Sequence, residues 1–162
     1  MTGKAAFSAD EWATLRDTPH FVAAAATLAG NSGLGTIKEG FATAKSFVEA
    51  SKAANGLIRD LAAREELEQA QAAIKSQVTF TDPEGTKAKL RAEALAKSAD
   101  AMKLLASKGA PDDTEAYKHF LMQLADTVTQ AAKEGGFLGI GGERVSADEQ
   151  AFLKELSSSL QA

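Results

Sequence analysis

Two glutamates flank a glycine-rich segment near the end of the chain, and their type and spacing point more directly to chemistry than any other residues. Glu134 stands directly before the segment 135–142, and Glu149 follows it. The helical angle of Glu149 puts its side chain on the same side as the leucines that follow it, so we expect it to face inward. Carboxylates that flank a glycine-containing turn, together with backbone oxygens, suit hard divalent cations. The pair Glu134 and Glu149 therefore predicts a site for Ca²⁺ or Mg²⁺, and no other cofactor is expected.

A second interpretation of Glu149 is structural. Ser146 and Glu149 have the spacing of a capping box, in which the third residue of a helix reaches back to the backbone N–H of the residue that caps it. This interaction also gives the glutamate a reason to turn inward. Both interpretations of Glu149 stay open at this point.

The glycine-rich segment 135–142 carries three large apolar residues, Phe137, Leu138 and Ile140. It follows a helical pattern and has the spacing of neither a dinucleotide-binding loop nor a phosphate loop, which argues against nucleotide binding. In one interpretation the glycines let the backbone turn so that the three side chains plug the end of the core. In the other they are displayed and contact a protein partner, a second copy of the chain or a membrane surface.

The remaining sequence offers little for catalysis. The chain has no cysteine and only two histidines, His20 and His119, neither of which has the spacing of a metal-binding motif. We expect both histidines at the surface. An enzyme needs groups whose protonation or nucleophilicity is tuned, and the sequence shows few, so the balance favours a non-catalytic protein.

The composition predicts an all-α fold. Alanine provides 34 of the 162 residues, leucine and methionine together 19, and valine and isoleucine only nine. Residues that lose little freedom in a helix therefore dominate. With no long apolar run or leader-like segment, we expect a cytoplasmic protein that forms a single helical domain over residues 1–162. The predicted architecture is an irregular bundle of about seven helices. In one form of this prediction, the bundle consists of two helix-turn-helix halves that are related by an internal repeat.

Capping and breaking signals predict where the helices begin and end. Ser8 and Glu11 form one capping box, and Thr18–Pro19 has the pattern of an N-cap followed by proline at the first helical position. We therefore expect a short first helix and a second one from Pro19. Asn55–Gly56 is typical of a helix C-terminus, and a helix is expected over residues 57–77.

Two later helices differ in how their side chains are distributed. The helix expected to follow residue 112 has the cleanest apolar stripe, and packing is predicted to centre on it. The six Lys and Arg of residues 86–108 fall all round their helix, which is typical of a solvated surface. With a net charge of −4 and no coherent basic stripe, we expect no binding to nucleic acid.

The junction around the glycine segment resembles a known family. Ala132-Lys133-Glu134-Gly135, then Val145-Ser146-Ala147-Asp148-Glu149 and Phe152-Leu153, is similar to the Ala-x-x-Asp-Gly-x-Val-Ser-x-x-Glu signature of TerB-like helical domains, named for bacterial tellurite resistance. Ser32-Gly33, Thr36 and Glu39 have the same spacing in the first half. The chain departs from the signature in having Glu134 in place of Asp, Ser32 in place of an acid and about six more residues between the second pair. The stretch also resembles small uncharacterised bacterial proteins with a Glu-Gly-Gly-Phe-Leu-Gly loop.

The resemblance implies a single helical bundle of paired halves with acidic residues at the helix-turn-helix junctions. It further implies a non-catalytic role in bacterial stress response or protein assembly, as a scaffold or interaction protein. The alternative function is a module that binds a small molecule or a divalent metal through the junction carboxylates. The partner and the oligomeric state are not indicated by the sequence.

Overall fold

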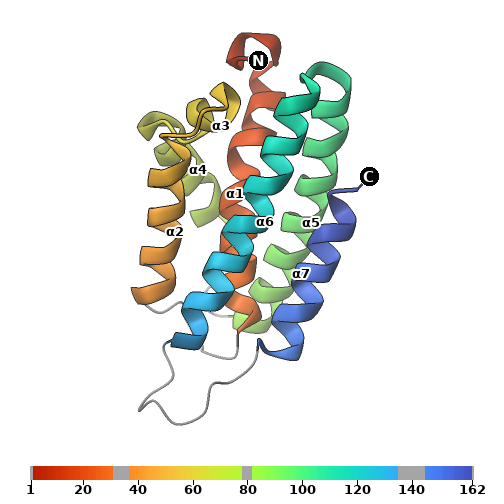
Figure 1. The fold of residues 1–162 in the computed structure, drawn as a ribbon. Helices are drawn as coiled ribbons and strands as arrows, with labels where there is room; N and C mark the ends of the chain where they lie inside the picture. The colour runs from red at the N-terminus through yellow and green to blue at the C-terminus, as the bar shows by residue number, and fades with distance from the viewer. Residues whose placement is uncertain (1, 31–36, 78–81, 135–144, 162) are drawn as a thin grey trace.

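The computed structural model describes residues 2–30, 37–77, 82–134 and 145–161 (Figure 1). These residues contain seven α-helices and no strand, which confirms the all-α prediction. A 3₁₀ turn over Lys4–Ala6 precedes the first α-helix. The α-helices are α1 (Ala9–Ala29), α2 (Ile37–Ala50), α3 (Gly56–Leu61), α4 (Arg64–Lys75), α5 (Pro83–Lys108), α6 (Pro111–Glu134) and α7 (Ala147–Ser159).

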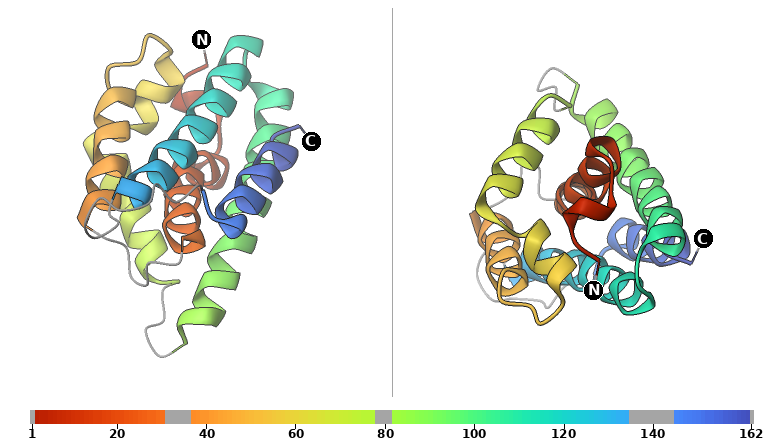
Figure 2. Two further views of the ribbon diagram at one scale, coloured as in Figure 1. Left: turned by 60° about the horizontal axis from the view of Figure 1, so that its bottom comes forward. Right: turned by 90° about the horizontal axis from the view of Figure 1, so that it is seen from above.

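Helix α1 is the centre of the bundle, so the prediction that packing centres on the helix after residue 112, which is α6, is wrong. Helix α1 packs against α4, α5, α6 and α7, and the view from above shows it surrounded by other helices (Figure 2). Residues 17–23 are buried without interruption, which is almost two helical turns and therefore includes every face of the helix. A helix buried on all sides cannot show a clear apolar stripe, and α1 shows none. Helix α6 packs against α1, α2, α3, α5 and α7. It therefore connects α2 and α3 with α5 and α7.

The expected helix start at Thr18–Pro19 is wrong, because Pro19 lies inside α1. Proline has no backbone N–H, so the carbonyl of Leu15 loses its usual intrahelical donor. The buried hydroxyl of Tyr117 on α6 donates to that carbonyl oxygen at 2.8 Å. Burial raises the pKa of Tyr117 far above its ordinary value, so the hydroxyl stays protonated and able to donate. A tertiary hydrogen bond thus replaces the bond that the proline removes.

The segment after α2 also differs from the expectation. Asn55 does not end a helix but begins one, because its side-chain oxygen accepts a hydrogen bond from the N–H of Ile58 at 3.2 Å. The single helix expected over residues 57–77 is two helices, α3 and α4, separated by a turn at residues 62–63. The short α3 turns the chain at one end of the bundle, next to α6 (Figure 1).

The Tyr117 bond gives a first prediction. Replacing Tyr117 with phenylalanine leaves the Leu15 carbonyl buried without a donor, which should lower the free energy of unfolding by about 1–3 kcal/mol. Pro19→Ala restores a backbone N–H for the same carbonyl, so Tyr117→Phe should cost clearly less in the Pro19→Ala background. Urea unfolding of the four proteins of this double-mutant cycle measures the difference. If Tyr117→Phe lowers the free energy of unfolding equally in both backgrounds, Tyr117 does not replace the donor that Pro19 lacks.

Candidate functional site

The capping box at the start of α7 is present in the structure. The N–H of Ser146 donates to the carboxylate of Glu149 at 2.7 Å, and the N–H of Glu149 donates to the Ser146 hydroxyl at 3.2 Å. Glu149 is buried, as its helical angle predicts. The cap therefore gives a sufficient reason for this glutamate to face inward.

The side chains of the other predicted site residues lie outside the part of the chain that the structure describes. Glu134 is the last residue of α6, and its side chain falls outside the described residues, as do Phe137, Leu138 and Ile140. Among the side chains that the structure does describe, no three His, Asp or Glu come together as metal ligands would. The Ca²⁺ or Mg²⁺ site at Glu134 and Glu149 and the partner role of the apolar loop remain predictions.

Asp113 is a fully buried carboxylate that the sequence analysis missed. It accepts hydrogen bonds from the backbone N–H of Thr2 at 2.7 Å and from the side-chain amide of Asn55 at 2.8 Å. Burial raises the pKa of Asp113, but these donors and the chain's amino terminus outweigh it and hold the pKa below its ordinary value. The carboxylate ties the N-terminus and the cap of α3 to α6, which is a structural role.

Glu66 on α4 is a second buried carboxylate with a structural role. Lys4 lies 2.5 Å from one of its oxygens and Arg16 lies 4.0 Å from the other. Burial raises the pKa of Glu66, while Lys4, the indole of Trp12 and Arg16 together hold it below its ordinary value. An ionised carboxylate with two cations beside it joins α4 to α1 and has little basicity to offer a substrate.

The two histidines lie in different environments. His119 is exposed on α6, as expected, but His20 is only 9% exposed and the expectation of a surface position is wrong for it. Its ring centroid lies 4.4 Å from that of Phe47 on α2, and its Nδ1 atom has no hydrogen-bond partner among the described residues. Burial lowers the pKa of His20 to about 4, with Asp17 opposing and Arg16 adding to the effect. His20 is therefore a neutral core residue at pH 7.

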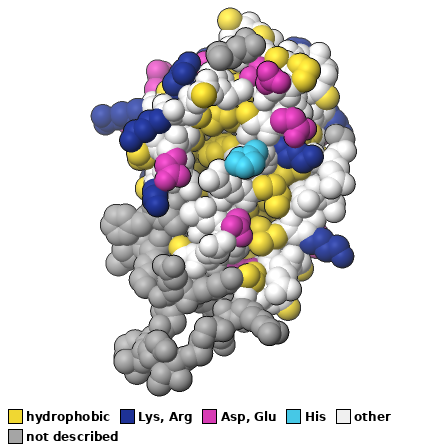
Figure 3. Space-filling model, in the orientation of Figure 1, with side chains coloured by type: hydrophobic (Ala, Val, Ile, Leu, Met, Phe, Trp, Pro, Cys, Tyr) yellow, Lys and Arg dark blue, Asp and Glu magenta, His cyan; other side chains and the backbone are white. Residues whose placement is uncertain are grey.

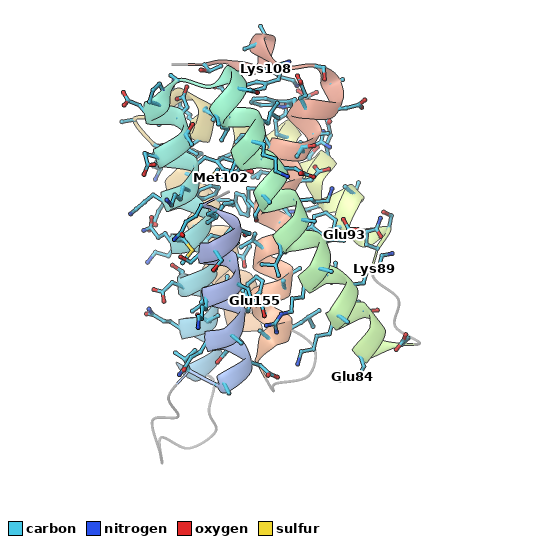
Figure 4. All side chains as sticks on the ribbon, turned by 90° about the vertical axis from the view of Figure 1, so that its right-hand side faces the viewer. Glu84, Lys89, Glu93, Met102, Lys108 and Glu155 are labelled. Atoms are coloured by element: carbon cyan, nitrogen blue, oxygen red, sulfur yellow. The ribbon has the colours of Figure 1, made fainter. Side chains whose placement is uncertain are left out.

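The cations of α5 are mostly paired. Lys87 and Arg91 contact Asp148 and Glu155 of α7 at 3.5 and 3.0 Å, and Lys108 contacts Glu11 of α1 at 2.7 Å. Figure 4 shows this side of the bundle, with Lys89 and Glu93 along α5 and Glu155 on the neighbouring α7. Charges of both signs alternate there, which agrees with a solvated surface.

A hollow lies on another face, between α2, α3 and α6, and we call it the α2–α6 groove. Its volume is about 310 Å³. The space-filling view shows apolar side chains gathered on this face, with a histidine at the edge of the apolar area (Figure 3). The lining residues are Ser46, Glu49, Ala50, Ala53, Asn55, Ile58, Ala116, His119, Phe120, Gln123 and Leu124.

The groove exists because small side chains face one another. Phe47 of α2 and Phe120 of α6 meet edge to face with centroids 5.9 Å apart and fill the space between the helices. One turn after Phe47, Ala50 ends α2, and Ala53 lies three residues beyond it. Both line the hollow, as does Ala116 of α6, and a methyl group fills little space at each of these positions. A large residue at any of these positions would close much of the hollow.

The polar side chains of the groove differ in whether they already have hydrogen-bond or ion-pair partners within the protein. The amide of Asn55 is already used, since its oxygen caps α3 and its nitrogen donates to Asp113. Glu49 is exposed, and its ion-pair partner within the described part of the chain is Lys45, 3.9 Å away on the same helix. His119 and Gln123, one turn apart on α6, are exposed at the opposite side of the groove. The groove thus combines an apolar floor with hydrogen-bonding groups on two helices.

The sequence could not have identified the groove from local signals. The positions of α6 that line it recur at intervals of three and four, so the helix face could be predicted. Which helix lies opposite, and that its residues there are alanines, depends on tertiary packing.

Comparisons of the chain with protein-family models, with curated proteins and with solved structures find no match. The TerB-like resemblance therefore stays a prediction. Within the described ranges, no helix has the length and apolar character needed to cross a bilayer.

Proposed function

We propose that this chain is a non-catalytic binding protein that holds a small organic molecule in the α2–α6 groove. The observation that carries the proposal is the hollow of about 310 Å³, which is lined by six apolar residues and by the polar residues Ser46, Glu49, Asn55, His119 and Gln123. Pockets for small ligands have volumes from about 300 Å³ upward, apolar walls and a small number of polar groups that orient the ligand. The α2–α6 groove has each of these properties.

A small molecule fits this face better than a second protein does. A stable protein interface buries about 1,200 Å² or more in total and usually contains large apolar side chains. Among the described residues Val48 is the large apolar side chain that stands exposed, and it does not line the groove. The apolar area of this face is instead concave and lies between two helices.

The groove also lacks the groups of a catalytic centre. Of its described lining residues, Glu49 and His119 have ionisable side chains, and both are exposed. The pKa values of Glu11, Glu66, Asp113 and His20 are lowered, and none of these four residues lines the groove. The buried ionisable groups of the described residues thus lie away from the groove, which supports a binding role rather than catalysis there.

The proposal is tested with tryptophol, a neutral indole alcohol that matches the groove in size and polarity. For about 12 non-hydrogen atoms we expect a dissociation constant in roughly the millimolar range, which saturation-transfer NMR can measure. Ala116→Leu fills the hollow from α6 and should weaken binding at least about tenfold without lowering the melting temperature. Ala96→Leu makes the same change at an exposed position of α5 and should bind as the wild type does. Absent binding to the wild type, or equal binding by Ala116→Leu, would refute the proposed function.

A further inference from the structure

We infer that the α2–α6 groove selects an amine, that is, a small molecule with an apolar body and one positive charge. This inference rests on the proposed function and adds the chemical class of the ligand. It depends on the distribution of charge around the groove, which is independent of the volume and the apolar floor.

Among the described residues that line the groove, Glu49 is the only one that carries a formal charge at pH 7 with histidine neutral. None of these described lining residues is a lysine or an arginine. An anionic ligand would therefore lie beside a carboxylate without a cation of the groove to neutralise it, whereas a cationic ligand would find a partner there.

Glu49 is free enough to accept such a ligand. Its side chain is 59% exposed, and that of Lys45 is 76% exposed. The 3.9 Å distance between Lys45 Nζ and the carboxylate is at the long end of ion-pair contacts, and an exposed pair one turn apart contributes little. A ligand ammonium held by the apolar floor can replace Lys45 at small cost.

The other side of the groove adds groups that suit an amine. Phe120 offers an aromatic ring whose position is fixed by its edge-to-face contact with Phe47, and a cation near an aromatic face is stabilised. Gln123 has a side-chain carbonyl that can accept a hydrogen bond from an ammonium group. Acceptors on α2 and α6 thus flank the apolar floor.

Three indole compounds with the same ring and different charge test the inference. Tryptamine carries an ammonium group, tryptophol a hydroxyl and indole-3-acetate a carboxylate. We expect tryptamine to bind the wild-type protein about fivefold tighter than tryptophol, and indole-3-acetate to bind weakest, because one exposed ion pair contributes about that factor. The preference should shrink at high salt, since the pair is screened.

Two substitutions on α2 should change the preference in opposite directions. Glu49→Gln removes the carboxylate and should make tryptamine and tryptophol bind within about a factor of two of each other. Lys45→Gln removes the competing ammonium and should tighten the binding of tryptamine alone. Glu68→Gln is the matched control, because Glu68 also forms an exposed ion pair one turn away, with Arg64 on α4, outside the groove.

The outcomes separate this inference from the proposed function. Equal affinity of the wild type for the three compounds, or tightest binding of indole-3-acetate, would overturn the choice of an amine and leave the groove as a binding site. A preference for tryptamine that survives in Glu49→Gln would also overturn it. Failure of all three compounds to bind would overturn the proposed function itself.

Discussion

Lowering the pH from 7 to 4.5 should remove about 2.5 kcal/mol from the free energy of unfolding, because His20 is buried in its neutral form. Its pKa is lowered from 6.5 to about 4 in the folded protein. The unfolded chain therefore binds a proton between these values that the folded protein does not, and each pKa unit is worth about 1.4 kcal/mol. The contribution of His20 to the free energy of unfolding is therefore full above pH 6.5 and is lost as the pH falls toward 4. Urea unfolding at a series of pH values measures the decline.

Other titrating groups affect a lower pH range. The pKa values of Glu66 and Asp113 are held below their ordinary values of 4.5 and 3.8. The stability that these carboxylates contribute is therefore present above their ordinary pKa values and is lost only as the pH falls below them. The decline between pH 6.5 and 4.5 should disappear in His20→Leu and persist in His119→Gln, where the exposed histidine is replaced. A stability that is flat from pH 7 to 5 in the wild type would contradict the burial of neutral His20.

Leu124→Ala should lower the free energy of unfolding by about 2–5 kcal/mol. Leu124 is 1% exposed and belongs to the apolar stripe of α6, which packs against five other helices. Removing its side chain loses apolar burial and leaves a cavity beside Phe120 and the α2–α6 groove. Because the vacated space adjoins a hollow, water can enter it and the cost should lie toward the lower part of the range.

The neighbouring Gln123 gives the control for this substitution. It is exposed on the same turn of α6, so Gln123→Ala should change stability by no more than about 0.5 kcal/mol. Chemical denaturation of both variants at pH 7 makes the comparison. A loss below half a kcal/mol for Leu124→Ala would show that the stripe of α6 is not the core of the protein.

The features that could be predicted from the sequence are those fixed by neighbours along the chain. The capping boxes at Ser8–Glu11 and Ser146–Glu149 are both present, because each needs only two residues three positions apart. The burial of Glu149 follows from its helical angle. The helical class follows from the abundance of alanine and leucine.

The features that the sequence misled us about depend on residues far away in the chain. Thr18–Pro19 has the local pattern of a helix start, but Tyr117, almost one hundred positions later, supplies the missing donor and lets α1 continue. Asn55–Gly56 has the pattern of a helix end, but Asn55 caps the next helix and is held by Asp113. His20 gives no sign of burial until Phe47 is placed against it.

The same distinction between local pattern and tertiary packing applies to the candidate site. The sequence directs attention to Glu149, whose described contacts are those of a helix cap, and to the apolar loop, which lies outside the described residues. The groove arises from Ala50, Ala53 and Ala116, residues that suggest no chemistry on their own. It becomes visible only when α2 and α6 are placed side by side.

The most direct test of the proposed function is to map tryptamine onto the protein by ¹H–¹⁵N NMR. If the groove binds tryptamine, the backbone amides whose signals shift on titration should belong to α2 after residue 45, to the turn before α3 and to residues 116–124 of α6. The same titration of Ala116→Leu should leave these signals nearly unmoved. Shifts confined to other helices, or to the ends of the bundle away from the α2–α6 groove, would contradict the account.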